Sequence, residues 1–273
     1  MKSNLIKRAL TGALFVIILI SAIIYSPITF VGLFALVSAY STYEFTGLLN
    51  KTRNIKVNRF ITSFGSFYLF VAFAGTLSGT VPYGIFIPYL AIVLYLFIKE
   101  LYLDKDDPIA NLGTIMLSQI YIGLFFSMMN VLAFNSGEYQ YILILALFIF
   151  LWVSDSGAYC VGSLIGKRKL FKRISPNKSW EGSIGGGILA LVSSLLIAKY
   201  NPVLSYQEWA GFALVVVIFG TWGDLIESLF KRKLEIKDSG AILPGHGGFL
   251  DRFDSTILAA PAAVLYLYII SLF

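Results

Sequence analysis

The stretch "YILILALFIFLWV", residues 141–153, decides the fold class of this chain. All of its side chains are aliphatic or aromatic, so a helix built from it has no polar stripe to face water. Similar runs recur along the chain, and several approach the ~20 residues needed to cross the hydrocarbon core of a bilayer. Of the 273 residues, 58% are hydrophobic and only 13% are charged, a composition outside the range of soluble globular proteins.

We therefore predict an all-α, polytopic integral membrane protein with about nine transmembrane helices. A soluble amphipathic bundle is excluded because these runs are apolar all round. The single cysteine, Cys160, rules out an internal disulfide framework. The predicted spans are 9–26, 28–49, 60–78, 82–99, 112–134, 140–163, 183–199, 208–229 and 256–272.

The positions of the basic residues predict the orientation of these helices. With the N-terminus in the cytoplasm, every one of the 21 lysines and arginines except Lys199 falls on the cytoplasmic side. Such a bias is typical of multi-pass membrane proteins, and it predicts a C-terminus on the outside of the cell's inner (plasma) membrane. The net charge of +6 is thereby explained by orientation and by contact with anionic membrane lipids. It gives no reason to expect nucleic acid as a partner.

The chain changes character near residue 140. Residues 1–139 contain one intramembrane acid, Glu44, and we interpret them as a scaffold for dimer or lipid contacts. Their connector "IKELYLDKDDP" has mixed charges and is expected to be a solvated surface loop. Residues 140–273 hold nearly all the unusual polar side chains and two predicted cytoplasmic loops, 164–182 and 230–255. We predict that this second region is catalytic.

Three acids interrupt the apolar helices of the second region: Asp155, Asp224 and Glu227. A carboxylate at membrane depth is costly and normally faces a cavity, a partner or an ion. A polar clamp between helices is the structural alternative, but three acids beside two basic loops favour a functional role. Helical spacing of i, i+3, i+4 and i+7 places Asp224 and Glu227 on one face together with Ser228 and Lys231.

The last predicted cytoplasmic loop, "KDSGAILPGHGGFLDRFDS" (237–255), ends in two acids, Asp251 and Asp254, that share a face of the following helix. Carboxylates brought by two helices to one membrane boundary suit Mg²⁺, which is usually held by one or two carboxylates together with substrate phosphates. One histidine and one distant cysteine make zinc a poor candidate. The "PGHGG" segment cannot form regular structure, and its backbone N–H groups can approach phosphate oxygens.

The other predicted loop contains "GKRKLFKRISPNKSWEG", residues 166–182, with six basic residues. Its helix-start pattern places Ser179 near an N-cap and holds Lys178 at a defined position, which favours Lys178 as a phosphate ligand. The role of Glu181 stays open at this point. Glycines on both sides of the loop have the small-xxx-small spacing of closely packed helices: Gly162 with Gly166, and Gly182 with Gly186.

The segment "SLFKRKLEIKDSGAILPGHGGFLDRFDS", residues 228–255, resembles position for position the signature of phosphatidate cytidylyltransferases, also called CDP-diacylglycerol synthases. The segments "DSGAY" (155–159), "SPNKSWEG" (175–182) and "GDLIES" (223–228) are similar to the accompanying motifs of that family. The resemblance covers roughly residues 152–255; the N-terminal half is similar only in being multi-helical.

The resemblance implies a nucleotidyltransferase of phospholipid biosynthesis that converts CTP and phosphatidic acid to CDP-diacylglycerol and pyrophosphate with Mg²⁺. It implies Asp224 and Asp251 as metal ligands, with Asp254 and Asp155 as further ligands. A second, monovalent cation such as K⁺ and a homodimer are also suggested by the family. The expected catalytic residues are Asp224, Asp251, Lys178 and Lys237.

The remaining expected site residues bind the substrates' phosphates. His246 is interpreted as shaping the loop or donating a hydrogen bond to a phosphate, because the attacking lipid phosphate is already ionised and needs no base. Arg252 has a structural ion pair as its alternative role. The expected substrate-binding residues are Lys231, Arg232, Ser228, Gly247, Gly248, His246 and Arg252.

Two other functions compete with this one. A CTP-dependent lipid kinase of the polyprenol type would use the same basic and acidic residues but would release CDP instead of pyrophosphate. A cation-coupled membrane transporter would use Asp155, Asp224 and Glu227 as an ion pathway, and it leaves "PGHGGFLDRFD" unexplained.

Overall fold

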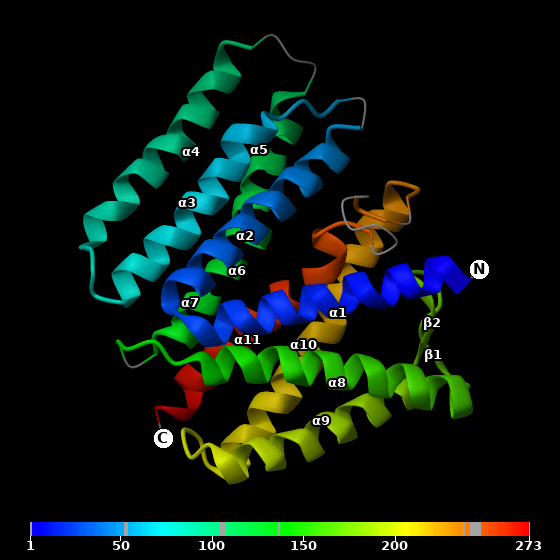
Figure 1. Ribbon diagram of the computed structural model, residues 1–273. Coiled ribbons are helices and arrows are strands. Elements are labelled where there is room, and N and C mark those ends of the chain that lie inside the picture. Colours follow the sequence, from blue (N-terminus) through cyan, green and yellow to red (C-terminus); the bar gives the residue numbers. More distant parts are fainter. Residues whose placement is uncertain are drawn as a thin grey trace. The chain divides into compact units, whose positions relative to one another are not determined.

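A computed structural model describes residues 2–51, 54–103, 107–135, 137–236, 238–240 and 247–272, with side chains from Thr11 onward. Two expected site residues, Lys237 and His246, lie outside the described residues. The helices and strands are labelled in Figure 1, and the chain divides into two compact units. The first comprises Met1–Tyr141 and Leu234–Phe253, and the second comprises Ile142–Lys233 and Asp254–Phe273. The functional division that we place at residue 140 stays a prediction.

The predicted all-α membrane fold is confirmed, because the structure is 79% helical. Within the described residues, eight helical segments are long and apolar enough to cross a membrane, and a shorter apolar helix, Thr11–Tyr25, makes a ninth. The helices of the first unit are α1 (Lys2–Tyr25), α2 (Pro27–Leu49), α3 (Arg59–Leu77), α4 (Phe86–Leu101), α5 (Pro108–Ser118), α6 (Phe125–Ser127) and α7 (Met129–Ala133).

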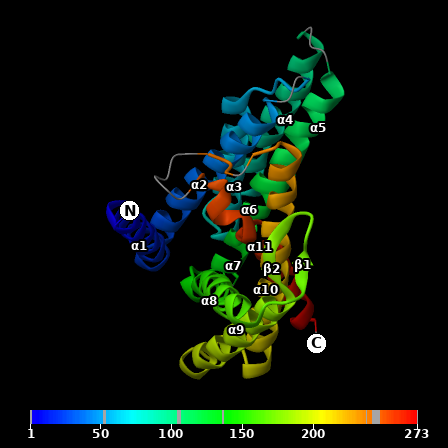
Figure 2. The same cartoon turned by 90° about the vertical axis from the view of Figure 1, so that its right-hand side faces the viewer.

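In the first unit, α2 packs along α3, and α3 also contacts α4 (Figures 1 and 2). The short 3₁₀ turn Tyr83–Ile85 leads into α4. The fifth predicted span is one apolar stretch that is not a uniform helix, because α5 passes into a π-helical segment, Gln119–Leu124, before α6 and α7. Gln119 is buried there and donates hydrogen bonds to the Thr62 carbonyl and the Ser66 hydroxyl of α3. Irregular backbone in a membrane helix thus coincides with a buried polar contact.

In the second unit, α8 (Tyr141–Ile165) and α9 (Trp180–Tyr200) meet through glycines. Gly157 lies against Gly186, and Gly162 lies against Gly182, so that side chains larger than hydrogen would separate the two backbones. This confirms close helix packing as the use of three of the four predicted small residues. The fourth, Gly166, follows the end of α8 and lies against the Gly162 carbonyl and the Ser179 hydroxyl.

The rest of the second unit consists of α10 (Tyr206–Lys233), a two-stranded antiparallel hairpin and α11 (Leu250–Ile270) from Asp254 onward; the first four residues of α11 belong to the first unit. The strands are β1 (Lys169–Phe171) and β2 (Ser175–Ser179), which follow α8 and precede α9 in the sequence. Both strands are labelled in Figure 2. The sequence predicted only a loop here. The hairpin ends where the Ser179 hydroxyl accepts the Gly182 N–H and begins α9, as the predicted N-cap requires.

Several helices begin earlier than their apolar runs. The predicted starts at 112, 183 and 256 become Pro108, Trp180 and Leu250 in the structure. The reason is that capping side chains such as Asp107 and Ser179, and polar first turns, extend a helix beyond the apolar segment that hydropathy detects. For α11 this extension matters, because it places Asp251 and Asp254 inside the helix.

Candidate active site

The second unit contains a cluster of acids and lysines centred on Asp224 of α10. The Lys178 Nζ atom, from the end of β2, lies 2.5 Å from the Asp224 Oδ2 atom. The side chains are 26% and 28% exposed, so the pair is accessible but partly shielded from solvent. The Ser228 hydroxyl donates to the other oxygen of Asp224 at 3.2 Å. Asp224 is thereby held from both sides.

A second ion pair lies one turn farther along α10. Lys231 pairs with Glu227, whose side chain is only 1% exposed. This pair and the Asp224–Ser228 hydrogen bond are both i, i+4 contacts, which confirms the predicted shared helix face. A buried carboxylate without a cation is strongly unfavourable. Breaking the ion pair would therefore be costly, and the pair keeps the Lys231 ammonium group beside the Asp224 cluster.

Two more acids belong to this cluster. Asp254 of α11 interacts electrostatically with Asp224, Lys231 and Lys178. Asp155 of α8 interacts with Lys178 and Asp224. The close approach of α10 and α11 depends on Gly223, because any side chain there would overlap the backbone oxygen of Asp254. The structure therefore brings together, from four elements, most of the expected residues of the second unit.

The charge of the cluster fits a divalent cation. Its four acids exceed its two lysines by two charges when all are ionised, and Lys178 already places a cation on Asp224. Among the residues that the structure describes, no three acids, histidines or cysteines converge closely enough to hold a metal by themselves. This donor set suits Mg²⁺, which takes one or two carboxylates and completes its coordination with substrate phosphates and water.

The hairpin is fixed to its neighbours by hydrogen bonds that also position Lys178. The Glu181 carboxylate accepts the backbone N–H groups of Lys167 and Arg168, which answers the question that the sequence left open. The Arg232 Nε atom donates to the Ile174 carbonyl in the hairpin at 3.2 Å. Arg232 therefore braces the hairpin in this structure, and its expected contact with a substrate phosphate stays a prediction.

A polar cavity and an apolar groove adjoin in the second unit. The cavity has a volume of about 200 Å³ and is lined by Asp155, Lys178 and Ser179 among others. The groove has a volume of about 430 Å³ and runs between α9 and α10. Three residues line both: Ser183, Val217 and Thr221. The polar cavity at Lys178 and the groove of aromatic and aliphatic side chains therefore share part of their lining.

The side chains of the apolar groove could not be singled out from the sequence, because they look like any lipid-facing residues. They include Trp180, Ile184 and Ile188 of α9 and Leu214, Ile218 and Trp222 of α10.

The remaining described site residues lie in the first unit, at the start of α11. The Asp251 Oδ2 atom accepts the N–H groups of Ser239 and Gly248, each at 2.8 Å. Gly247 has a positive φ of 82°, which favours glycine. The Gly248 N–H is engaged by Asp251, whereas Arg252 is exposed. A metal site shared by Asp224 and Asp251, and phosphate binding by Gly247 and Gly248, stay predictions.

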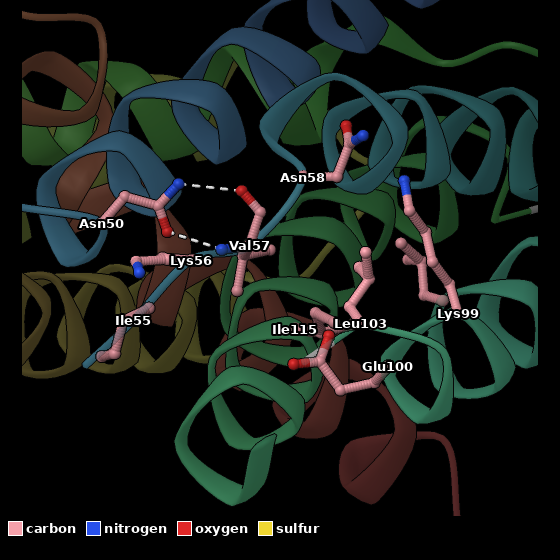
Figure 3. Close-up of a pocket in the computed structure, with 10 residues that line it drawn as sticks. Asn50, Ile55, Lys56, Val57, Asn58, Lys99, Glu100, Leu103 and Ile115 are labelled. Atoms are coloured by element: carbon pink, nitrogen blue, oxygen red, sulfur yellow. Dashed lines mark hydrogen bonds between the residues drawn. The ribbon is translucent and has the colours of Figure 1, made fainter. Parts of the chain in front are cut away.

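A separate pocket of about 400 Å³ lies within the first unit (Figure 3). The Asn50 side chain closes one wall by two hydrogen bonds to the backbone of Val57, and Lys99 lines the pocket. Glu100 also lines it and is buried, with its Oε1 atom accepting from Asn111. The expectation that this connector is solvated throughout is therefore wrong at Glu100, because a tertiary hydrogen bond compensates its burial.

The fold and the site define a class: a helical, multi-pass membrane protein with a lysine–carboxylate cluster beside a polar cavity that adjoins an apolar groove. Residues 6–270 match the cytidylyltransferase family, and the chain belongs to that family. The family predicted from the motifs is confirmed.

Three curated relatives carry the name phosphatidate cytidylyltransferase. The Bacillus subtilis protein is 43% identical over 152 residues, which cover 55% of this chain and 56% of the relative. The Haemophilus influenzae protein is 46% identical over 124 residues, 44% of this chain and 43% of the relative. The Staphylococcus aureus (strain COL) protein is 48% identical over 120 residues, 43% and 46% of the two chains. The chain thus spans about half the length of the curated relatives that it matches.

Proposed function

We propose that this protein is a phosphatidate cytidylyltransferase of the inner (plasma) membrane, working at the cytoplasmic boundary. It transfers CMP from CTP to phosphatidic acid and releases pyrophosphate. The observation that carries the proposal is that the polar cavity at Lys178 and the apolar groove between α9 and α10 share lining residues. A substrate that fits this arrangement has an anionic head and a hydrocarbon tail. Family membership and the names of the relatives support the cytidylyl group as the one transferred.

The reaction needs positioning and charge neutralisation more than proton transfer. An oxygen of the lipid phosphate attacks the α-phosphorus of CTP, and the bond from that phosphorus to the oxygen bridging it to the β-phosphorus breaks. The electron pair of the broken bond leaves with pyrophosphate. A phosphate monoester with a second pKa near ~6 is largely ionised at neutral pH, so no base is required. Two anions must instead be held together in line.

In this proposal Lys178 holds the lipid phosphate, a role supported by its position in the lining of the polar cavity and by the contact of its ammonium group with Asp224. Lys231, paired with buried Glu227, adds a second positive charge that interacts with Asp254 of the same cluster. Both lysines can stabilise charge on the transferring phosphoryl group without moving far. Phosphate contacts by Ser228, Arg232, Lys237, His246 and Arg252 complete the proposal.

Bound Mg²⁺ would be held by Asp224 and Asp251, with Asp254 and Asp155 as further ligands, and would neutralise the triphosphate charge. The grouping of Asp155 and Asp254 with Asp224 in the second unit supports this assignment. A second, monovalent cation such as K⁺ and a homodimer stay predictions.

A test of the overall reaction uses the purified protein with phosphatidic acid, Mg²⁺ and CTP labelled at either the α- or the γ-phosphorus. We expect α-label in the lipid product and γ-label in pyrophosphate. Label from the γ position in the lipid would contradict the proposal and indicate a CTP-dependent lipid kinase. Absence of both labels from the lipid would contradict both enzyme functions. The cation-coupled transporter would then be the next hypothesis to test.

The apolar groove can be tested separately by filling it. Gly187 lines the groove, and a Cβ atom there would meet no other atom within 4 Å. We expect Gly187→Leu to raise the KM for phosphatidic acid by about tenfold, because the new side chain displaces about one or two kcal/mol of apolar contact between the lipid and the groove. The KM for CTP should stay the same. Gly113→Leu is the matched control, because Gly113 is an exposed glycine of α5 with equally open surroundings. Equal effects of both variants would contradict an acyl-chain site here.

A further inference from the structure

Glu44 of α2 is a buried acid that the proposed reaction does not use. Its side chain is only 6% exposed. The sequence assigned it to a scaffold region, with no role of its own. Because a buried carboxylate inside an apolar helix is costly unless other groups compensate it, its contacts should indicate its role.

Those contacts lead to the start of α11. The Glu44 Oε2 atom accepts the N–H of Leu250, the first residue of α11, at 2.9 Å, although the two residues are 206 apart in sequence. The Ser239 hydroxyl donates to the same oxygen at 3.4 Å. The first N–H groups of a helix have no partners within that helix, and a carboxylate is favoured at its positive end. Glu44 is thus a cap supplied by a distant helix.

Two glycines before α11, Gly240 and Gly248, approach this carboxylate closely. A Cβ atom at Gly240 or at Gly248 would overlap its oxygens. Among the described residues, the Oε1 atom has no hydrogen-bond partner, and it lies against both glycines. Glu44 therefore contacts two stretches of the chain before and at the start of α11, residues 239–240 and residues 248–250.

The same loop residues also hold Asp251. Its Oδ2 atom accepts the N–H groups of Ser239 and Gly248, and both of these residues touch Glu44. We infer that Glu44 is a positioning residue: it fixes the loop and the start of α11, and through them it aims the Asp251 carboxylate at the nucleotide. The kinetic consequence rests on the proposed function, whereas the anchoring of the loop does not.

The kinetic test compares two equally buried acids of the first unit. We expect Glu44→Gln to raise the KM for CTP and the Mg²⁺ concentration for half-maximal rate by about tenfold or more, as loss of an outer-sphere support does. The KM for phosphatidic acid should stay the same, because the lipid-binding residues lie in the second unit. Glu100→Gln is the control, since Glu100 is also 6% exposed but bonds Asn111. A normal KM for CTP in folded Glu44→Gln overturns the inference.

A second readout does not depend on activity. In a Cys160→Ser background, Ser239→Cys places a thiol at a position that is 6% exposed and touches Glu44. We expect Glu44→Gln to increase the rate of maleimide labelling of this thiol about tenfold, which corresponds to ~1.4 kcal/mol of lost anchoring. Glu100→Gln should leave the labelling rate unchanged. An unchanged labelling rate overturns the anchoring. Faster labelling in a protein that never transfers CMP refutes the proposed function alone.

A third variant covers the case in which Glu44→Gln does not fold. Gly240→Ala pushes the loop from the Glu44 carboxylate without removing the acid. It should give the same selective rise in the KM for CTP, while Gly113→Ala, which meets no neighbour, should give none. A normal KM for CTP in Gly240→Ala overturns the inference.

Discussion

Asp224→Asn should lower the rate of CMP transfer by about 10³-fold or more, the largest effect that we expect from a single substitution. Asp224 is the centre of the cluster: it pairs with Lys178, accepts from Ser228 and interacts with Asp254 and Asp155. Asparagine has the same shape and can still accept from Ser228, so the change removes the charge that attracts both Lys178 and a metal. The measurement is the initial rate of CDP-diacylglycerol formation at saturating CTP and Mg²⁺.

A second acid on the same helix serves as the control for Asp224→Asn. Glu208 lies in the first turn of α10 and accepts the Ser205 N–H, which makes it a cap at the end of the helix far from the cluster. Glu208→Gln should therefore retain activity. Gel filtration in detergent should show both variants folded. A folded Asp224→Asn protein with a near-normal rate would remove Asp224 from the metal site.

Lys178→Met should lower kcat/KM for phosphatidic acid by about 10²-fold, because it removes the cation that lines the polar cavity and leaves three interacting acids less balanced. Methionine keeps the length and the apolar stem of lysine, so the hairpin should still pack. The KM for phosphatidic acid and the kcat are measured together. We expect both to change, since the lysine contacts the same phosphate before and during the attack.

Lys172→Met is the control for the effect of hairpin charge. Lys172 lies exposed in the turn between β1 and β2. If the hairpin lysines act only by attracting anionic lipid, the two substitutions should reduce the rate equally, and the difference should vanish at high salt. That result would contradict a specific role for Lys178.

Much of the cluster follows from local patterns. The i, i+4 pairs of α10, Asp224 with Ser228 and Glu227 with Lys231, are consequences of helix geometry. The N-cap at Ser179 is similarly local, because the capping side chain and its partner at Gly182 are three residues apart. Such features depend on a few neighbouring residues, so they are readable without any knowledge of the tertiary structure.

Other features had no local signal. The sequence showed a lone acid at Glu44 and left Glu181 open, but their partners are backbone N–H groups, which every residue except proline carries. Nothing in the sequence can single out one N–H among hundreds. The burial of Glu100 was mispredicted for a different reason: its partner is the Asn111 side chain, and the two meet only after α4 and α5 have packed.

The sequence by itself determined the membrane class, the family and the grouping of charges on one face of α10, because hydropathy, motif spacing and helical periodicity are properties of short segments. Only the tertiary structure decided which lysine meets Asp224 and that the polar cavity adjoins an apolar groove. It also decided which acid caps α11. These pairings join residues from separate helices and strands, and they depend on how closely glycine-containing segments can approach, a property of packing and not of any single segment.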